Sequence, residues 1–384
     1  MTILMIPRGV PTSRETQYGN FEYEQAKAFV RLGHKVIIAT VDTRFRFIWR
    51  KVGFSIYQQD NIMIYTLFIC PGVIIGLFGT KALERFLSWQ WRKMANCIME
   101  HEGKIDVIYP HYLFNTHKAV HFFNQFHAPV VAMEHWSEIN KPIILPHIQK
   151  MGEDTYPKVD KLLTVSNAAG TSIKKHFGVD STVVHNMIGD NFTYVPQQHE
   201  RNRVLFVSTG NLIHRKGFDL LIESFARLQL PKDKWALNII GTGEKYDDLK
   251  KLIAKHNLTE NIHLIGKQTS EQIIKWLNES DVFVLSSRME TFGVVYIEAM
   301  ACGLPIIATP CGGPEEYVNE KNGLLVPVDD VDALATAIKY MYEHHQDYDR
   351  QAIADDCKAR FSSEVISKQL IDIFADVLNK ANNH

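Results

Sequence analysis

Cysteine is scarce in this sequence, and none of the five cysteines stands in a C-x-x-C pair. Their number and spacing argue against a zinc site or a disulfide framework, so a reducing cytosol is the natural compartment. They are Cys70, Cys97, Cys302, Cys311 and Cys357. The N-terminus lacks the basic region and long apolar run of a signal peptide. A net charge of −1 also argues against a general nucleic-acid binder.

A long uncharged run occurs at residues 61–80. Its length would admit a transmembrane helix, but Pro71 and Gly72 interrupt it midway. Ile62–Ile69 is rich in β-branched residues, so we interpret the run as a buried strand followed by the approach to a helix. A transmembrane span is the alternative.

With 384 residues, 46% hydrophobic and 22% charged, the chain is typical of a soluble globular protein of two domains. In the first half, short apolar runs alternate with amphipathic stretches, which indicates a parallel sheet covered by helices. The predicted strands are Thr2–Ile6, Lys35–Thr40, Val107–Tyr109, Val130–Met133 and Lys161–Val165. The predicted helices are Phe21–Leu32, Ala82–Glu102, Asn115–Phe126 and Asn167–His176.

The same alternation begins again at Arg203, after a turn-rich and polar link. The predicted strands there are 203–210, Ala236–Ile240, Ile262–Leu264, Val282–Leu285 and Ile306–Ala308. The predicted helices are Gly217–Leu228, Glu244–Lys255 and Glu271–Asn278, and everything after Asp329 reads as helical. We therefore expect a first domain of residues 1–188 and a second of residues 189–362.

The stretch Val282–Pro314 carries the most informative pattern. A predicted buried strand leads into a loop with Glu290 and then into helical spacing that contains Glu298. A helix that begins near Gly293 presents free backbone N–H groups and a positive dipole end, which suit a phosphate. Glu298 would lie roughly 8 Å farther along, at about 1.5 Å per residue. This span fits a nucleotide with its pyrophosphate at the amides and its ribose on Glu298.

Glu290 and Glu298 form an E-x7-E pair, flanked by the sequences EAMACGLPIIAT and GGPEEYV. This region closely resembles the retaining glycosyltransferases of family four, also called glycosyl transferases group 1, which have the GT-B fold. The glycines and other residues in register are Phe292, Gly293, Gly303, Pro305, Gly312 and Gly313. The resemblance implies an α/β protein of two Rossmann-like domains, with parallel sheets facing across a cleft. It also implies that the C-terminal helix, about residues 363–384, packs back on the first domain.

The resemblance further implies a hexosyltransferase. It would move a sugar from a UDP- or GDP-sugar to a glycan or polyprenyl-linked acceptor, with retention of configuration, in cell-surface polysaccharide synthesis. It implies no cofactor. A non-catalytic nucleotide-binding scaffold and a nucleotide-sugar epimerase are the alternatives.

Lys216 stands directly before Gly217 and a predicted helix, and it resembles the diphosphate-binding lysine of the family. Asn211 occupies the position of a family arginine, so either Arg215 replaces that arginine or the contact is missing. Glu290, Lys216 and His135 are the implied catalytic residues. We expect the side chains of Glu290 and Lys216 to face a solvated cleft.

Further donor contacts follow from the resemblance. Gly243 lies in a glycine turn, and Gly266 and Lys267 follow the next strand, where the loop of the family meets the base. The implied set is completed by Phe292, Gly293, Val294 and Glu298.

In the first domain, Gly19 precedes the first helix, where a side chain would obstruct a phosphate. His111 and His135 both follow predicted strands, at the edge of a parallel sheet where ligands bind. His135 matches the family position that contacts the transferring sugar. Because the chain has 17 histidines, the alternative for each is an ordinary surface residue.

We predict no metal at the donor site. Asp330–Asp332 has a D-x-D pattern, but it precedes a helical run and fits an N-cap better. The charge of the leaving group would then be met by Lys216, Arg215 and helix N-termini.

Two segments, residues 44–54 and 81–93, interleave cations with aromatic side chains. This pattern suits a protein that rests on an anionic bilayer. The family resemblance implies that this bilayer is the inner leaflet of the plasma membrane, contacted from the cytoplasm. The alternative is an ordinary solvated face whose aromatic rings pack inward.

Overall fold

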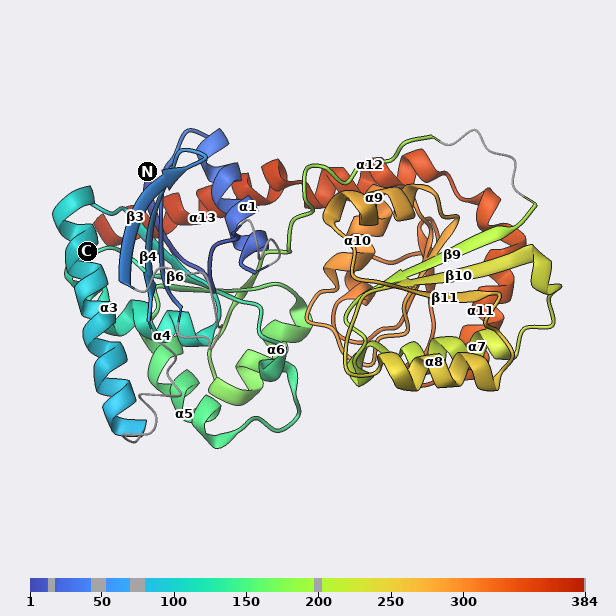
Figure 1. The fold of residues 1–384 in the computed structure, drawn as a ribbon. Coiled ribbons are helices and arrows are strands. Elements are labelled where there is room, and N and C mark those ends of the chain that lie inside the picture. Colours follow the sequence, from blue (N-terminus) through green and yellow to red (C-terminus); the bar gives the residue numbers. More distant parts are fainter. Residues whose placement is uncertain (13–17, 43–52, 70–79, 197–201, 383–384) are drawn as a thin grey trace. The chain divides into compact units, whose positions relative to one another are not determined.

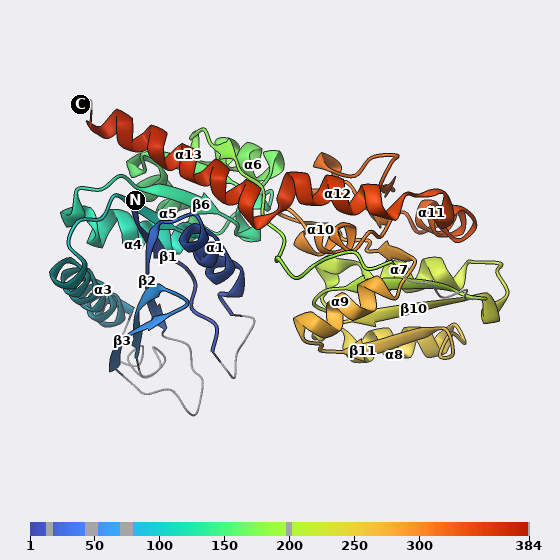
Figure 2. The ribbon, with the colours of Figure 1, turned by 90° about the horizontal axis from the view of Figure 1, so that it is seen from above.

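The computed structural model describes residues 1–12, 18–42, 53–69, 80–196 and 202–382. The chain forms two compact units, one of Met1–Val184 with Ile366–His384 and one of His185–Val365. Each unit has a largely parallel sheet with helices on both faces (Figures 1 and 2). The α/β architecture predicted from the alternating pattern is therefore confirmed.

In the first unit, five strands form a sheet in the order β3-β4-β2-β1-β5. Four are parallel: β1 (Thr2–Ile6), β2 (Lys35–Asp42), β4 (Ile62–Phe68) and β5 (Val107–Pro110). A smaller parallel sheet contains β6 (Val131–Glu134), β7 (Lys161–Thr164) and β8 (Thr182–Val183). Isolated bridges at Ile108 with Val130 and at His111 with Met133 join the two sheets.

The edge strand β3 (Gly53–Gln59) was not predicted, and it runs antiparallel to β4. The two strands are joined through Asp60 and Asn61, which both have positive φ, at 49° and 60°. Such a tight turn directs the chain straight back along β4. The interpretation of Ile62–Ile69 as a buried strand is confirmed for β4, whereas residues 70–79 lie outside the described residues.

The helices of the first unit are α1 (Asn20–Arg31), α3 (Thr80–Glu102), α4 (Leu113–Phe122), α5 (Pro146–Thr155), α6 (Asn167–Phe177) and α13 (Ser363–Asn382). Alternate residues of β1 face opposite sides of the sheet, and Leu4 and Ile6 join the core cluster formed with α3 and α4. On α13, Phe374 contacts Phe29 of α1 and Tyr109 of β5. The C-terminal helix is thus part of the core of this unit.

The second unit has six parallel strands in the order β11-β10-β9-β12-β13-β14. They are β9 (Val204–Thr209), β10 (Trp235–Ile240), β11 (Ile262–Gly266), β12 (Val282–Val284), β13 (Ile306–Ala308) and β14 (Gly323–Leu325). Figure 1 shows α7 (Phe218–Ala226) and α8 (Tyr246–Lys255) on one face, and α9 (Ser270–Asn278), α10 (Val294–Ala301) and α12 (Arg350–Phe361) on the other. The helix α11 (Val331–His344) packs beside α7.

The five-stranded sheet and the six-stranded sheet each contain a point where the order of strands reverses. From β1 the chain builds outward through β2 to β4, and then returns to place β5 on the other side of β1. From β9 it builds outward through β10 to β11, and then returns to place β12 on the other side of β9. In open parallel sheets, ligands bind outside the carboxyl ends of the strands at such reversal points.

The segments predicted to rest on a membrane are only partly described. Of 44–54, the basic and aromatic residues before Gly53 lie outside the described residues. On α3, Trp91 is only 5% exposed, whereas Trp89 is 57% exposed and lies 5.8 Å from the ammonium of Lys93. The described helices include none with both the length and the apolar composition needed to cross a bilayer.

Candidate functional site

The central feature of the second unit is a contact between Lys216 and Glu290, which lie 74 positions apart in the sequence. The Lys216 Nζ donates to Glu290 Oε1 at 2.5 Å, and the hydroxyl of Ser287 donates to the same oxygen at 2.7 Å. Lys216 is 9% exposed and Glu290 is 5% exposed. The expectation that both side chains face a solvated cleft is therefore wrong for this structure. Two opposite charges that meet at hydrogen-bond distance shield each other from water.

The backbone explains why the two loops meet. Lys216 ends a short 3-10 helix after β9, and Gly217 then adopts a left-handed conformation with φ of 67° before α7 begins. A Cβ on Gly217 would lie 1.9 Å from the carbonyl oxygen of Ser286, which follows β12. The hydroxyl of Ser286 donates to the Gly217 carbonyl at 2.7 Å. Only glycine permits this approach of the two loops at the reversal point between β9 and β12.

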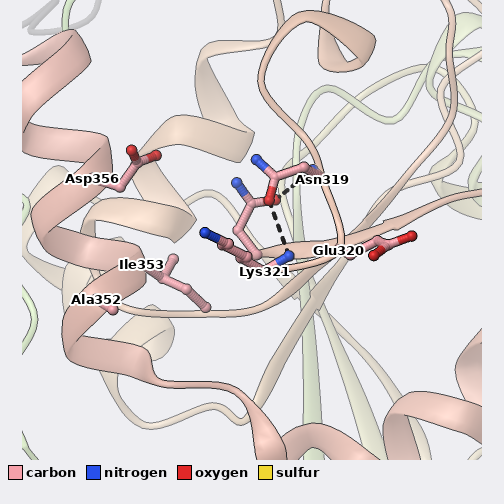
Figure 3. A pocket seen from close by; sticks show the side chains of 7 residues that line it. Asn319, Glu320, Lys321, Ala352, Ile353 and Asp356 are labelled. Carbon is pink, nitrogen blue, oxygen red and sulfur yellow. Dashed lines mark hydrogen bonds between the residues drawn. The ribbon is translucent and has the colours of Figure 1, made fainter.

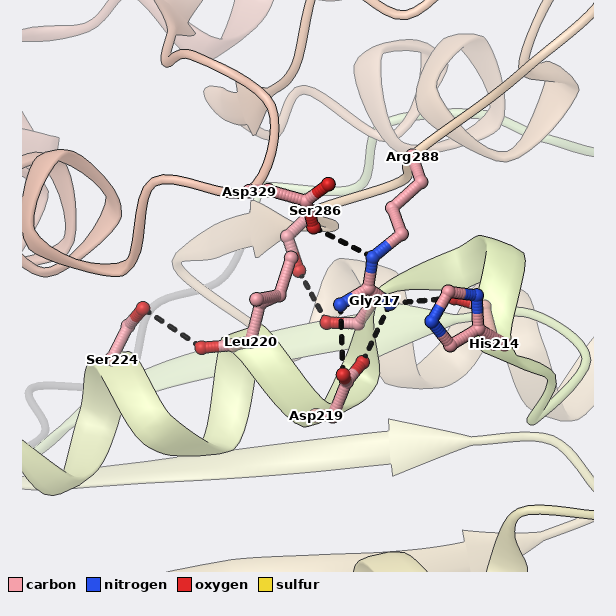
Figure 4. Close-up of polar contacts among 8 residues, drawn as sticks. All are labelled: His214, Gly217, Asp219, Leu220, Ser224, Ser286, Arg288 and Asp329. Carbon is pink, nitrogen blue, oxygen red and sulfur yellow. Dashed lines mark hydrogen bonds and ion pairs between the residues drawn. The ribbon is translucent and has the colours of Figure 1, made fainter.

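Arg288 fastens the same two loops together, and Figure 4 shows its guanidinium directed at partners from three segments. Two of its nitrogens donate to the two oxygens of Asp219 at 2.9 and 2.8 Å, and its Nε donates to Asp329 at 2.6 Å. It also donates to the carbonyl of His214 at 2.7 Å. The hydrogen bond to Asp219 raises the pKa of Arg288 above its ordinary value.

The residues after Glu290 form the N-terminus of α10, as predicted. Gly293 caps the helix with φ of 88°, and a Cβ there would lie 2.7 Å from the ring of Tyr296. The hydroxyl of Tyr317 donates to the carbonyl of the buried Phe292 at 2.8 Å. The helix therefore begins at Val294 with its first N–H groups in the orientation that suits an anion.

Glu298 lies farther along α10 and is half-buried. Burial raises its pKa to about 7, and the positive charge of Lys216 opposes that rise. Lys216, Glu290 and Glu298 thus belong to one electrostatic group.

The glycine turns predicted to line the nucleotide site lie at the same edge of the sheet. A Cβ on Gly243 would lie 2.4 Å from the carbonyl oxygen of Leu212, so the turn packs backbone to backbone against the loop that leads to Lys216. Gly266 ends β11 with φ of 80°, and its carbonyl accepts from the N–H of Gly241 at 2.9 Å. The side chain of Lys267 is exposed, and Arg215 is half-buried, with its carbonyl accepting from the N–H of Arg288 at 2.8 Å.

In the first unit, the rings of His111 and His135 lie side by side with parallel planes, at the ends of β5 and β6. His111 Nδ1 lies 3.0 Å from His135 Nε2, so one ring donates to the other. Burial lowers the pKa of His111 to about 3, which keeps that ring neutral at pH 7. The side chain of Phe21, near the start of α1, contacts His135 at 5.6 Å between ring centroids. The buried His111 therefore fixes the orientation of the half-buried His135.

Gly19 lies at the start of α1, close to that pair. It has φ of 72°, and a Cβ there would lie 2.1 Å from the carbonyl oxygen of Gly9. Arg8, in the same loop, donates to the buried Glu22 at 2.9 Å and covers the ring of Tyr112 at 4.6 Å. Gly19 is therefore required for the packing of its own loop, as well as being a predicted phosphate contact.

Sequence reasoning did not find three polar residues that shape these sites: Ser287, Arg288 and Glu134. Glu134 ends β6 and accepts hydrogen bonds from Tyr156 at 2.7 Å and from the N–H of Trp136 at 2.6 Å. Burial raises its pKa to about 7. Position at the end of a predicted strand was the available signal. It was applied to His111 and to His135, which follows Glu134 directly, but not to Glu134 itself.

The Asp330–Asp332 motif acts as predicted, because Asp330 caps α11 and accepts from the N–H of Ala333 at 2.9 Å. A pocket of about 630 Å³ lies elsewhere, between α12 and the turn that contains Asn319 and Asn322 (Figure 3). The oxygen of each Asn side chain accepts a backbone N–H within that turn. The predicted site residues do not line this pocket.

Models of two known protein families match the chain. Residues 193–355 match the model of "Glycosyl transferases group 1", and residues 19–191 match that of "Glycosyltransferase Family 4". The chain belongs to this glycosyltransferase family. The first model covers both Lys216 and Glu290, and the second covers His111 and His135.

One relative is a GDP-mannose-dependent monoacylated α-(1-6)-phosphatidylinositol monomannoside mannosyltransferase of Corynebacterium glutamicum. It is 28% identical over 228 residues, which is 54% of this chain and 59% of the relative. The chain spans 59% to 64% of the length of three such curated relatives.

Solved structures confirm the predicted GT-B fold of the chain. Sucrose-phosphate synthase of Thermosynechococcus elongatus is similar at a TM-score of 0.77 and 17% identity, over 99% of both chains. A protein of Anabaena, HepE, solved with UDP and glucose, is similar at a TM-score of 0.72 and 18% identity. That likeness covers 98% of this chain and 100% of HepE.

Proposed function

We propose that this glycosyltransferase moves a hexose from a UDP- or GDP-sugar to a glycan or lipid-linked acceptor, with retention of configuration. The observation that carries the proposal is the meeting of Lys216 and Glu290 where the strand order reverses between β9 and β12. At that point, the cation can bind the diphosphate of a nucleotide-sugar and the carboxylate can bind its sugar. The UDP and glucose bound by HepE support the donor class.

The donor-binding roles follow from this position. The ammonium of Lys216 and the N–H groups of Gly293 and Val294 would bind the diphosphate. Glu298 would accept hydrogen bonds from the ribose, and Glu290 from hydroxyls of the sugar. The two described hydrogen bonds of the Glu290 carboxylate both fall on Oε1, so Oε2 is the oxygen that would receive a sugar hydroxyl.

In the transfer step, the bond between the anomeric carbon and the donor phosphate breaks, and the acceptor oxygen attacks from the same face. A donor phosphate oxygen takes the acceptor proton, so no side chain is needed as a nucleophile. Lys216 would stabilise the charge of the leaving diphosphate. His135, held in place by His111, would contact the sugar that is transferred.

We propose a lipid-linked acceptor, and with it a peripheral contact with an anionic bilayer through residues 44–54 and 81–93. The phosphatidylinositol monomannoside named for the Corynebacterium relative is one acceptor of that kind. On α3, the exposed Trp89 beside Lys93 combines an apolar ring with a cation, as side chains at a membrane surface do.

Donor turnover tests the proposal. A panel of nucleotide-sugars is screened by thermal shift, and those that bind are incubated with glycan and lipid-linked acceptors. Release of nucleoside diphosphate together with a glycosylated product is the expected result. Conversion of the donor to a stereoisomer without release would instead show an epimerase. Donor binding without turnover, across the acceptors tried, would favour a non-catalytic scaffold.

Single substitutions then separate the two roles. We expect Lys216→Ala to weaken binding of the bare nucleoside diphosphate, and Glu290→Ala to affect mainly the donor with its sugar. Both should abolish transfer. Lys251→Ala and Glu260→Ala remove like charges from exposed positions of the same unit and should leave transfer unchanged. Equal loss of nucleoside diphosphate affinity in the two site variants would contradict the division of roles.

A further inference from the structure

A group of metal-ligating side chains joins two helices of the first unit. His117 and His121 lie four residues apart on α4, and therefore on one face of it. Asp154 lies near the end of α5. Its Oδ2 is 2.7 Å from His121 Nε2 and 3.6 Å from His117 Nδ1. One ligand atom from each of the three residues lies within 4.8 Å of the others.

We propose that His117, His121 and Asp154 bind one zinc ion that joins α4 to α5. Two imidazoles and a carboxylate are a ligand set that zinc takes in proteins. With bonds of about 2.0–2.2 Å, tetrahedral ligand atoms lie roughly 3.4 Å apart. The contact of 3.6 Å already matches that separation, and the contact of 2.7 Å needs to open by less than an ångström.

An ion can reach the three side chains from solvent. All three are partly open to solvent, which gives zinc access and leaves a fourth position for water. Cysteine takes no part, so the scarcity of cysteine does not bear on this site.

Two neighbours compete with the ion. The Lys158 ammonium lies 2.6 Å from Asp154 Oδ1, whereas the two histidine contacts are made by Oδ2. The Thr155 hydroxyl lies 2.9 Å from His117 Nδ1. Zinc at Nδ1 requires the tautomer with hydrogen on Nε2 and replaces the contact with Thr155. Because Lys158 competes with zinc for Asp154, removing Lys158 should strengthen zinc binding, whereas removing a ligand should weaken it.

The test is a calorimetric titration of the metal-free full chain with zinc at pH 7. We expect one zinc ion to bind, and magnesium, which prefers oxygen ligands, to give no heat. His121→Ala and Asp154→Asn should each weaken zinc binding by at least about tenfold. Lys158→Ala should strengthen it by about two- to fivefold, because a competing cation is removed. His147→Ala, an exposed histidine on the same helix as Asp154, should have no effect.

A second pair of ligands provides an internal comparison. Cys97 and His101 lie four residues apart on α3, with Sγ and Nδ1 separated by 3.7 Å. Zinc binding that is lost in His101→Ala and kept in His121→Ala would overturn the proposal, as would the absence of any zinc binding. The readout is metal affinity and does not depend on sugar transfer, so this proposal and the proposed function can fail separately.

Discussion

Replacing Gly217 with alanine tests whether the close approach of two loops holds the donor-binding residues in place. The added Cβ meets two obstacles: the left-handed backbone, with φ of 67°, and the Ser286 carbonyl oxygen at 1.9 Å. The first costs about 1–2 kcal/mol of unfolding free energy. The second cannot be relieved without moving backbone, and overpacking of this kind costs about 1–3 kcal/mol more.

Gly266→Ala is the matched control for stability. Gly266 is in the same unit, has φ of 80°, and has no atom within 4 Å of an added Cβ. It therefore carries the backbone cost alone. At about 2–4 °C per kcal/mol for a unit of this size, Gly217→Ala should melt roughly 2–12 °C below Gly266→Ala in scanning calorimetry.

Gly217→Ala should also affect sugar transfer, which is compared with the wild type. Separating its loop from that of Ser286 also separates Lys216 from Glu290, and a displacement of about 1 Å can lower a catalysed rate roughly 100-fold. Folded Gly217→Ala should therefore release nucleoside diphosphate about 100 times more slowly than the wild type. A variant as stable as Gly266→Ala, with transfer at the wild-type rate, would refute the reasoning.

Four further predictions follow from single contacts. Arg288→Ala should lower the unfolding free energy by about 1–3 kcal/mol and slow transfer, and Arg288→Lys should restore only part, because lysine cannot make the paired contact. Calorimetry measures the unfolding free energy, and nucleoside diphosphate release measures transfer. Full rescue by Arg288→Lys would contradict the importance of the bidentate pair. Glu298, with a pKa of about 7, should bind ribose when ionised, so nucleoside diphosphate affinity should rise between pH 6 and 8 by a component absent in Glu298→Gln. Identical pH profiles would exclude that role. Because the pKa of Glu134 is about 7 when folded and near 4.5 when unfolded, its burial costs stability as pH rises from about 4.5 through 7. Glu134→Gln should therefore lose less stability than the wild type between pH 5 and 8, as measured by urea unfolding. Finally, Arg92 and Lys93 changed together to Glu should weaken flotation with anionic liposomes at low salt. Active wild-type protein that fails to float at low salt would contradict the membrane contact.

Local features of the fold were predictable from the sequence where the signal was local. The helix after Glu290 begins at Val294 because Gly293 supplies a left-handed cap. The carboxylate of Asp330 caps α11 by accepting a hydrogen bond from the N–H of Ala333, three residues later. Apolar runs likewise located β9 to β13. Each of these signals operates within a few residues, which is the range over which periodicity and capping act.

The contacts that build the candidate site could not be predicted in this way. Lys216 and Glu290 are 74 positions apart, and Arg288 and Asp219 are 69 positions apart. Their pairing depends on β12 returning to lie beside β9, a choice of strand order that no local pattern contains. The same limit explains β3, whose direction follows from a turn with two positive φ angles at Asp60 and Asn61.

The contact between Lys216 and Glu290 also bears on how the donor would bind under the proposed function. In this structure the ammonium neutralises a carboxylate that is almost fully buried, so neither charge can leave the other without a substitute partner. A diphosphate offers Lys216 that substitute, but it leaves Glu290 in need of a donor of hydrogen bonds. The hydroxyls of a sugar on the same molecule meet that need. Under the proposed function, the arrangement would therefore favour an intact nucleotide-sugar over a bare nucleoside diphosphate. The loss of the sugar on transfer would help the Lys216 and Glu290 pair to form again and release the product.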